Sequence, residues 1–193
     1  WKLGYTPGGS SSGSAASLAA GMIYGSMGSC TGGSIRVPAS NCNVVGFKPT
    51  YGLVSRFGVF PLSWSLDHPG PMARTVEDCA LILQSVAGYD SKDPSSARVS
   101  IPDYASVLNG DIRGIRVGVP KELRDGTSKE VDDLIEHALV VLKELGASVE
   151  EVSVPITDAY ATTAGNVITW SEAAQIHTPF LEHLHDYSIG VRE

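Results

Sequence analysis

The segments GGSSSGS at residues 8–14 and TGGSIR at residues 31–36 decide the interpretation of this chain. Each segment places serines in a glycine-rich backbone, and Ser10 and Ser34 lie 24 residues apart. An alanine-rich stretch between them, within residues 14–20, predicts a helix. This layout suits a nucleophilic serine at position 34, a second serine at position 10 that relays a proton, and a row of backbone N–H groups that face a developing oxyanion.

Both segments also fit plainer alternatives. A Gly/Ser linker has the composition of residues 8–14, but a helix-forming stretch follows it at once. A phosphate-binding loop has the same glycine spacing, but Ser14 stands where such a loop has the lysine that reaches the phosphates. Residues 31–36 could form a tight turn whose serine caps a helix. Gly32 and Gly33, however, allow consecutive N–H groups to turn toward one point.

The histidines offer neither a recognisable base nor a metal site. The sequence has five of them, and none sits in a strand-end context typical of a Ser-His-Asp triad. The pattern Gly-x-Ser-x-Gly is also missing, because Arg36 stands in place of the second glycine. The three histidines between residues 177 and 185 have no cysteine or carboxylate at ligand spacing, so we expect surface histidines and no bound metal.

Composition excludes several classes of protein. The chain has 193 residues, of which 42% are hydrophobic and 18% charged, as in ordinary globular proteins. A formal net charge of −7 without a Lys/Arg cluster argues against direct binding to nucleic acid or to an anionic membrane. No apolar run is long enough for a membrane span. Three widely spaced cysteines indicate reduced thiols and a cytoplasmic location.

The order of predicted elements indicates an α/β fold with a mixed β-sheet covered by helices, incomplete in this chain. We expect all of 1–193 to belong to one domain, with a Ser/Gly-rich catalytic core at 1–100 and a βαβ and helical part at 112–193. In the first part we expect helices at 14–20 and 76–87, a buried strand or helix end at 22–27, and a strand at 44–47. Thr75 caps the second helix and Gly88 ends it.

The order of predicted elements in the second part is that of a parallel strand–helix–strand unit. Strands are expected at 115–120 and 148–154, and a further helix at 167–184. The segment TSKE at 127–130 predicts a capping box at the start of the intervening helix, and Gly146 ends that helix. One face of the helix is apolar and is expected to be buried, namely Val131, Leu134, Ile135, Ala138, Leu142 and Leu145.

Further motifs follow in the same register as the two glycine-serine segments. They comprise Pro38-Ala39, residues 42–52, Ser65-Leu66-Asp67, Gly70-Pro71 and residues 74–78. Together these motifs resemble the amidase signature family, densely in the first half of the chain and more loosely in the second. The resemblance implies the family's α/β fold and an amidase, a hydrolase that acts on carbon–nitrogen bonds other than peptide bonds.

The resemblance also implies roles for the two serines. In the family, a serine at the position of Ser34 attacks the amide carbonyl and forms an acyl-enzyme. A serine at the position of Ser10, held by a cis peptide bond, shuttles the proton in a Ser-Ser-Lys triad. The N–H groups of Thr31, Gly32, Gly33 and Ser34 would form the oxyanion hole.

The family's base is a lysine well upstream of these serines. Lys2 lies too close to Ser10 to match it, and Lys48 matches a different family position. We therefore expect the catalytic lysine outside these 193 residues, so that this chain alone is inactive. Since the chain opens on Trp1 rather than methionine, we expect its true N-terminus to be missing.

Cys30 is the main departure from the family pattern, which has an aspartate there. The resemblance implies that this carboxylate supports the glycine loop and pairs with Arg36. A thiol carries no charge at its ordinary pKa, so we expect Arg36 to lose a buried partner and activity to lie below that of a Cys30→Asp variant. Two alternatives are that Cys30 itself is the nucleophile and that its presence has no functional meaning. Cys42 and Cys79 are expected to be core thiols.

Three functions remain open at this stage. The first is a free-standing amidase that acts on a small-molecule amide, alone or as a homo-oligomer. The second is the glutaminase component (the A subunit) of a glutamyl-tRNA(Gln)/aspartyl-tRNA(Asn) amidotransferase, which would pass ammonia to partner subunits. The third is a non-catalytic amidase-like binding protein. The segment TWSEAA at 169–174 looks more like the general amidases and favours the first function, and none of the three needs a cofactor.

Overall fold

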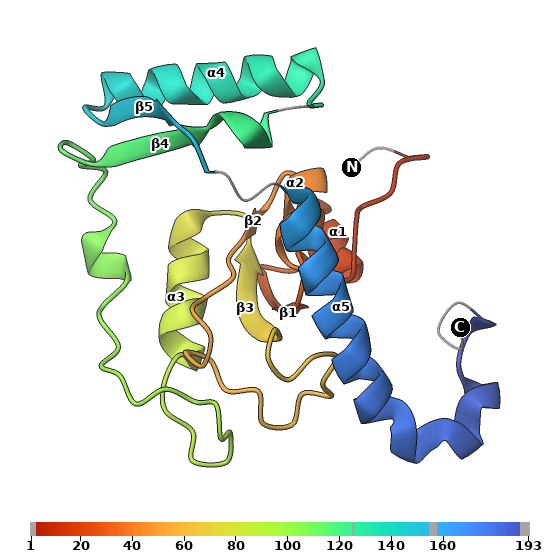
Figure 1. Ribbon diagram of the computed structural model, residues 1–193. Helices are drawn as coiled ribbons and strands as arrows, with labels where there is room; N and C mark the ends of the chain where they lie inside the picture. The colour runs from red at the N-terminus through yellow and green to blue at the C-terminus, as the bar shows by residue number, and fades with distance from the viewer. Residues whose placement is uncertain (1–2, 125, 155–157, 190–193) are drawn as a thin grey trace. The chain divides into compact units, whose positions relative to one another are not determined.

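The computed structural model describes residues 3–124, 126–154 and 158–189 (Figure 1). The chain divides into two compact units. One comprises Trp1–Val107 with Asn166–Glu193, and the other comprises Leu108–Gly165. That all of 1–193 forms part of one domain stays a prediction.

A three-stranded antiparallel sheet organises the first unit. Its strands are β1 (Gly25–Cys30), β2 (Val45–Gly46) and β3 (His68–Ala73), and β3 lies between the other two (Figure 1). Gly28 of β1 lies opposite Gly70 of β3. This pairing places two residues without side chains next to each other, so other parts of the chain can approach the sheet closely there.

Three helices pack against this sheet. They are α1 (Ser12–Ala19), α2 (Arg36–Asn41) and α3 (Val76–Val86). One buried cluster joins the first two helices to the sheet, and it consists of Ala15, Leu18, Cys30, Ile35, Ala39, Cys42 and Met72. The core of this unit therefore lies between α1, α2 and one face of β1 and β3.

Helix α3 packs on the opposite face of the sheet. A Cβ atom built on Gly25 would lie 2.5 Å from Cδ1 of Ile82 in α3, whereas one on Gly28 would lie 2.7 Å from Oγ of Ser11. Gly25 and Gly28 are three positions apart in β1, and side chains alternate between the two faces of a strand. The sheet is consequently covered on both faces, as an α/β layer structure requires.

The local signals for α3 are confirmed. The Thr75 hydroxyl accepts a hydrogen bond from the N–H of Asp78 at 3.1 Å, and Gly88 follows the helix with φ +154°. The expected core thiols are also confirmed, because Cys42 and Cys79 are both buried. Burial raises the pKa of Cys79 to about 11, which keeps this thiol protonated at neutral pH.

The strand expected at 22–27 begins later than predicted. Gly21 has φ +70° and turns the chain after α1, and the N–H of Met22 donates to the carbonyl of Ser17. Met22 and Tyr24 are exposed, so the apolar run before Gly25 is not a buried strand. The prediction was wrong because apolar composition alone does not reveal where a turn ends.

The second unit is a parallel strand–helix–strand unit, as predicted. Strands β4 (Arg116–Pro120) and β5 (Ser148–Val152) pair in parallel, and α4 (Lys129–Glu144) connects them. The predicted capping box is wrong by one position. Ser128 is the N-cap, and its hydroxyl accepts from the N–H of Val131 at 3.4 Å. The Thr127 hydroxyl instead donates to Asp132 at 2.6 Å.

The apolar face of α4 is only partly covered. Ile135 and Leu142 are half-buried, but Val131, Leu134 and Leu145 are exposed. A sheet of two strands is narrower than the apolar arc of the helix, so it shields only one edge of that arc. Ala138 is exposed as well, so the prediction of one buried face was wrong for four of its six residues.

Helix α5 (Asp158–His177) starts before the position expected from the sequence. It gives way to a 3-10 segment at Thr178–Asp186, whereas the sequence predicted one helix over 167–184. Pro179 has no N–H to donate to an α-helical hydrogen bond, which accounts for the change at this point. Within the described ranges, no helix combines the length and the apolarity that crossing a bilayer would need.

The contact between β3 and the loop after β2 predicts a strong effect at one glycine. A Cβ atom on Gly70 would lie 2.3 Å from the carbonyl oxygen of Phe47 and 2.7 Å from Cδ of Pro49. We expect Gly70→Ala to lower the free energy of unfolding by about 2–3 kcal/mol, because the backbone must shift. The measurement is urea unfolding followed by circular dichroism.

Gly13→Ala is the matched control. Gly13 lies in α1, and no atom lies within 4 Å of the position that a Cβ atom would take there. Alanine at this position should raise the free energy of unfolding by about 0.5–1 kcal/mol, because it restricts the unfolded chain more than glycine does. Equal stabilities of the two variants would contradict the close packing described for Gly70.

Candidate active site

The structure brings the two glycine-serine segments together. The N–H of Ser11 donates to the carbonyl oxygen of Ser34 at 3.1 Å. The Ser11 side chain lies over Gly28, and any side chain on that glycine would collide with it. The peptide bond between Gly9 and Ser10 is cis, as the family resemblance implied. Segments separated in sequence by α1 and β1 therefore meet at one end of the sheet.

Residues 31–34 form a loop between β1 and α2. Gly33 has φ +148°, a conformation that favours glycine, and its carbonyl oxygen accepts from the N–H of Val37 at 2.8 Å at the start of α2. In the part of the chain that the structure describes, the N–H groups of Thr31, Gly32, Gly33 and Ser34 donate no hydrogen bond. Four consecutive donors are thus free to bind an anionic or carbonyl oxygen.

The predicted serines differ in their surroundings. Ser10 is exposed and Ser34 is half-buried. Ser10 opens onto a cleft of about 620 Å³ whose wall is mainly apolar, with Ser11, Met27, Gly28, Ser29, Val54, Ser55, Val59, Pro69 and Val86 as its other lining residues. Gly32, Gly33 and Arg36 line a separate hollow of about 300 Å³. Ser10 and the glycine loop thus line two different hollows, while the hydrogen bond from Ser11 to Ser34 joins their segments.

Arg36 lies on the solvent-facing side of α2. Its side chain is exposed, because α2 buries Pro38 and Ala39 and turns Arg36 outward. A carboxylate at position 30 would be the buried member of the implied pair with Arg36, and the expected gain in activity of Cys30→Asp stays a prediction. Cys30 itself has no exposed surface and belongs to the core cluster. A thiol in that position does not reach substrate, which argues against a nucleophilic role.

A buried carboxylate anchors the first residue of the glycine loop. The Thr31 hydroxyl donates to Oδ1 of Asp67 at 2.5 Å. Oδ2 of Asp67 accepts from the N–H groups of Leu62 and Ser63 at 2.8 and 2.9 Å. Asp67 is only 5% exposed, so these donors replace the water that a carboxylate otherwise requires.

A second carboxylate continues this network from α5. Glu172 accepts from the hydroxyls of Ser63 and Ser65 at 2.5 and 2.6 Å, and from the N–H of Ser65 at 3.0 Å. Burial alone would raise the pKa of Glu172, but these hydrogen bonds outweigh it and lower the pKa below its ordinary value of 4.5. Sequence reasoning missed this contact, because no spacing rule joins residues 63–65 to residue 172. The sequence drew attention to the motif Ser65-Leu66-Asp67 and to the segment at 169–174, but nothing in it joined the two.

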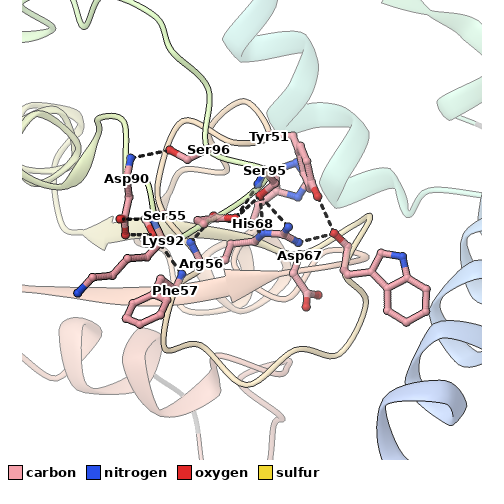
Figure 2. Close-up of polar contacts among 12 residues, drawn as sticks. Tyr51, Ser55, Arg56, Phe57, Asp67, His68, Asp90, Lys92, Ser95 and Ser96 are labelled. Atoms are coloured by element: carbon pink, nitrogen blue, oxygen red, sulfur yellow. Dashed lines mark hydrogen bonds and ion pairs between the residues drawn. The ribbon is translucent and has the colours of Figure 1, made fainter.

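The loops beside the cleft are held by the Arg56 side chain (Figure 2). Its guanidinium donates to Oγ of Ser95 at 2.7 and 3.1 Å and to the carbonyl oxygen of Trp64, and it lies 4.8 Å from the ring centre of Tyr51. Asp93 accepts from the backbone N–H of Arg56 at 2.7 Å. This cluster fixes the segment that carries the cleft residues Val54 and Ser55.

The comparisons with known proteins fit this geometry. The model of the Amidase family matches residues 1–189. The chain belongs to the amidase family. It is 53% identical over 175 residues to the A subunit of glutamyl-tRNA(Gln) amidotransferase from Lysinibacillus sphaericus, and the match covers 90% of the chain and 36% of that relative. The chain thus spans just over a third of the length of the curated relatives that it matches.

Solved structures of the family share the fold of this chain. The A subunit of glutamyl-tRNA(Gln) amidotransferase from Thermotoga maritima superposes with a TM-score of 0.84 at 38% identity, over 96% of this chain and 39% of the other. The peptide amidase from Stenotrophomonas maltophilia gives a TM-score of 0.80 at 36% identity, over 93% and 38%. The α/β fold class predicted from the sequence is therefore confirmed.

The cluster around Arg56 predicts a strong effect at Asp93, which is buried and also accepts from the N–H and hydroxyl of Ser95. Burial raises the pKa of Asp93, but these hydrogen bonds outweigh it and hold the pKa below its ordinary value of 3.8. In Asp93→Asn, the side-chain NH2 group replaces one carboxylate oxygen and faces the N–H and hydroxyl groups that donated to it. We therefore expect the free energy of unfolding at pH 7 to fall by about 3 kcal/mol.

The pH dependence of this loss has a defined sign. Because the folded-state pKa is lowered, the carboxylate stabilises the fold fully above pH 3.8 and loses that effect as the pH falls below it. Urea unfolding of Asp93→Asn and of the unmutated chain should therefore converge in strong acid. As a control, Asp111→Asn changes a carboxylate that is exposed and paired only with its neighbour Arg113 among the described residues. A loss as large in that variant would contradict the account.

Proposed function

We propose that the complete protein hydrolyses the C–N bond of a small carboxamide through an acyl-enzyme on Ser34. The observation that carries this proposal is the loop of four uncommitted N–H groups ending at Ser34, joined by a hydrogen bond to the segment that contains Ser10. Membership of the amidase family supports the same reaction. No step of the reaction calls for a metal or an organic cofactor.

The chemistry follows from these groups. Oγ of Ser34 attacks the amide carbon and transfers its proton to Ser10. Ser10 transfers the proton in turn to a lysine base, which we expect outside these 193 residues. The N–H groups of Thr31, Gly32, Gly33 and Ser34 bind the oxyanion of the tetrahedral intermediate, and each such donor contributes roughly 3–4 kcal/mol. The amine or ammonia leaves with a proton, and water then releases the acid.

The substrate class, the location and the oligomeric state of this amidase also belong to the proposal. A mainly apolar cleft beside Ser10 suits a small organic amide. The negative formal charge makes direct contact with nucleic acid unfavourable, and reduced cysteines suit the cytoplasm. A free-standing amidase of this kind would work alone or as a homo-oligomer.

A second candidate function has a specific observation in its favour. Several relatives at 51–53% identity are named as the A subunit of glutamyl-tRNA(Gln) amidotransferase. If this protein shares their role, glutamine is the amide that Ser34 attacks and the released ammonia passes to partner subunits. Glutaminase activity that rises sharply on addition of the other amidotransferase subunits would select this function over the free amidase.

The proposed nucleophile predicts covalent labelling of the complete protein. A fluorophosphonate should form an adduct on Ser34 that mass spectrometry maps, and Ser34→Ala should abolish it. Ser10→Ala should slow labelling by about 100-fold or more, because it removes the proton relay. Ser85→Ala, an exposed serine in α3, is the matched control and should label as the unmutated protein does.

Two results would contradict the proposal. An adduct on Cys30 would make the thiol the nucleophile despite its burial. A folded protein that forms no adduct on either residue would favour a non-catalytic binding protein.

A further inference from the structure

Thr31 is the side-chain anchor of the glycine loop ahead of Ser34. Gly32 and Gly33 have no side chains, so nothing on them fixes the direction of their N–H groups. Thr31 stands between β1 and these glycines, and its hydroxyl donates to Asp67. Backbone hydrogen bonds from Val37 and Ser11 hold the far end of the loop, whereas its Thr31 end depends on what holds Asp67.

Asp67 is held by the loop that precedes it. Its carboxylate accepts from the N–H groups of Leu62 and Ser63, and its own N–H donates to the carbonyl oxygen of Ser63 at 2.9 Å. These bonds close a tight loop over residues 62–67, so moving this loop moves Asp67. Ser63 has no exposed surface, which leaves its hydroxyl dependent on a protein partner.

Glu172 of α5 supplies that partner. Its carboxylate accepts three hydrogen bonds from Ser63 and Ser65, at 2.5–3.0 Å. Glu172 therefore fixes the loop over residues 62–67 from a distant part of the sequence. The series of contacts runs from Glu172 through Ser63 and Asp67 to Thr31, and every link in it is a hydrogen bond between described residues.

We propose that Glu172 and Asp67 are positioning residues, which hold Thr31 so that the N–H groups of residues 31–34 converge on the substrate oxygen. This inference rests on the proposed function. Neither carboxylate touches the substrate, and both act through the direction of the glycine loop. Losing the anchor should weaken binding of the transition state more than binding of the substrate, so kcat falls while KM stays nearly constant.

The test uses the complete protein and a pair of variants at one residue. Thr31→Val keeps the shape of the side chain and removes its hydroxyl, and we expect kcat to fall about 10- to 100-fold with KM within about twofold. Thr31→Ser keeps the hydroxyl and should recover most of that loss. Rescue by serine distinguishes the hydrogen bond to Asp67 from packing of the threonine methyl group.

Glu172→Gln tests the far end of the series of contacts. Its amide nitrogen cannot accept a hydrogen bond, so we expect kcat to fall about tenfold. Because both changes cut the same series of contacts, the double variant with Thr31→Val should lose little more than Thr31→Val alone. Ser171→Ala, a neighbouring exposed serine on α5, is the control and should leave kcat unchanged.

The outcomes separate this inference from the proposed function. All rates are referred to folded protein, measured by circular dichroism and by fluorophosphonate labelling of Ser34. If the unmutated protein labels Ser34 but Thr31→Val keeps its kcat, or if the two losses simply add, the positioning role is refuted and the proposed function stands. If Glu172→Gln does not fold, the valine and serine variants at Thr31 decide the question. If the unmutated protein does not label Ser34, both proposals fail together.

Discussion

The hydrogen bond from the N–H of Ser11 to the carbonyl oxygen of Ser34 is the contact on which the candidate site depends. It joins two segments that α1 and β1 separate in the sequence. Two glycines of the sheet allow the chain to approach it closely beside this bond. Gly28 leaves room for Ser11, and its partner Gly70 leaves room for the carbonyl oxygen of Phe47.

The glycine loop at residues 31–34 is the centre of the candidate catalytic site. The glycine loop leaves four N–H groups without protein partners among the described residues, so these donors are available to a ligand oxygen. The surrounding structure holds the loop at both ends. Thr31 is tied to Asp67 on one side, and Gly33 begins α2 through its bond to Val37 on the other.

Local signals in the sequence located α3 but misplaced the start of α4 by one residue, and contacts between distant residues were not recoverable from the sequence. Thr75 and Gly88 marked α3 correctly because capping involves neighbours only. The motifs at 8–14 and 31–36 identified the family, and the family determined the fold. The exposure of Val131, Leu134 and Leu145 on α4 was not predicted, because it depends on how much of the helix the two strands cover. Glu172 shows the same limit, since its partners Ser63 and Ser65 lie in a loop without regular structure.

The most direct test of the central claim is a crystal structure of the complete protein with a phosphonyl group bound to Oγ of Ser34. The account predicts that the phosphoryl oxygen lies about 2.7–3.1 Å from at least two backbone nitrogens of residues 31–34. It also predicts that Thr31 still donates to Asp67. A phosphoryl oxygen that points away from all four nitrogens would contradict the account, because the glycine loop would then not be an oxyanion hole.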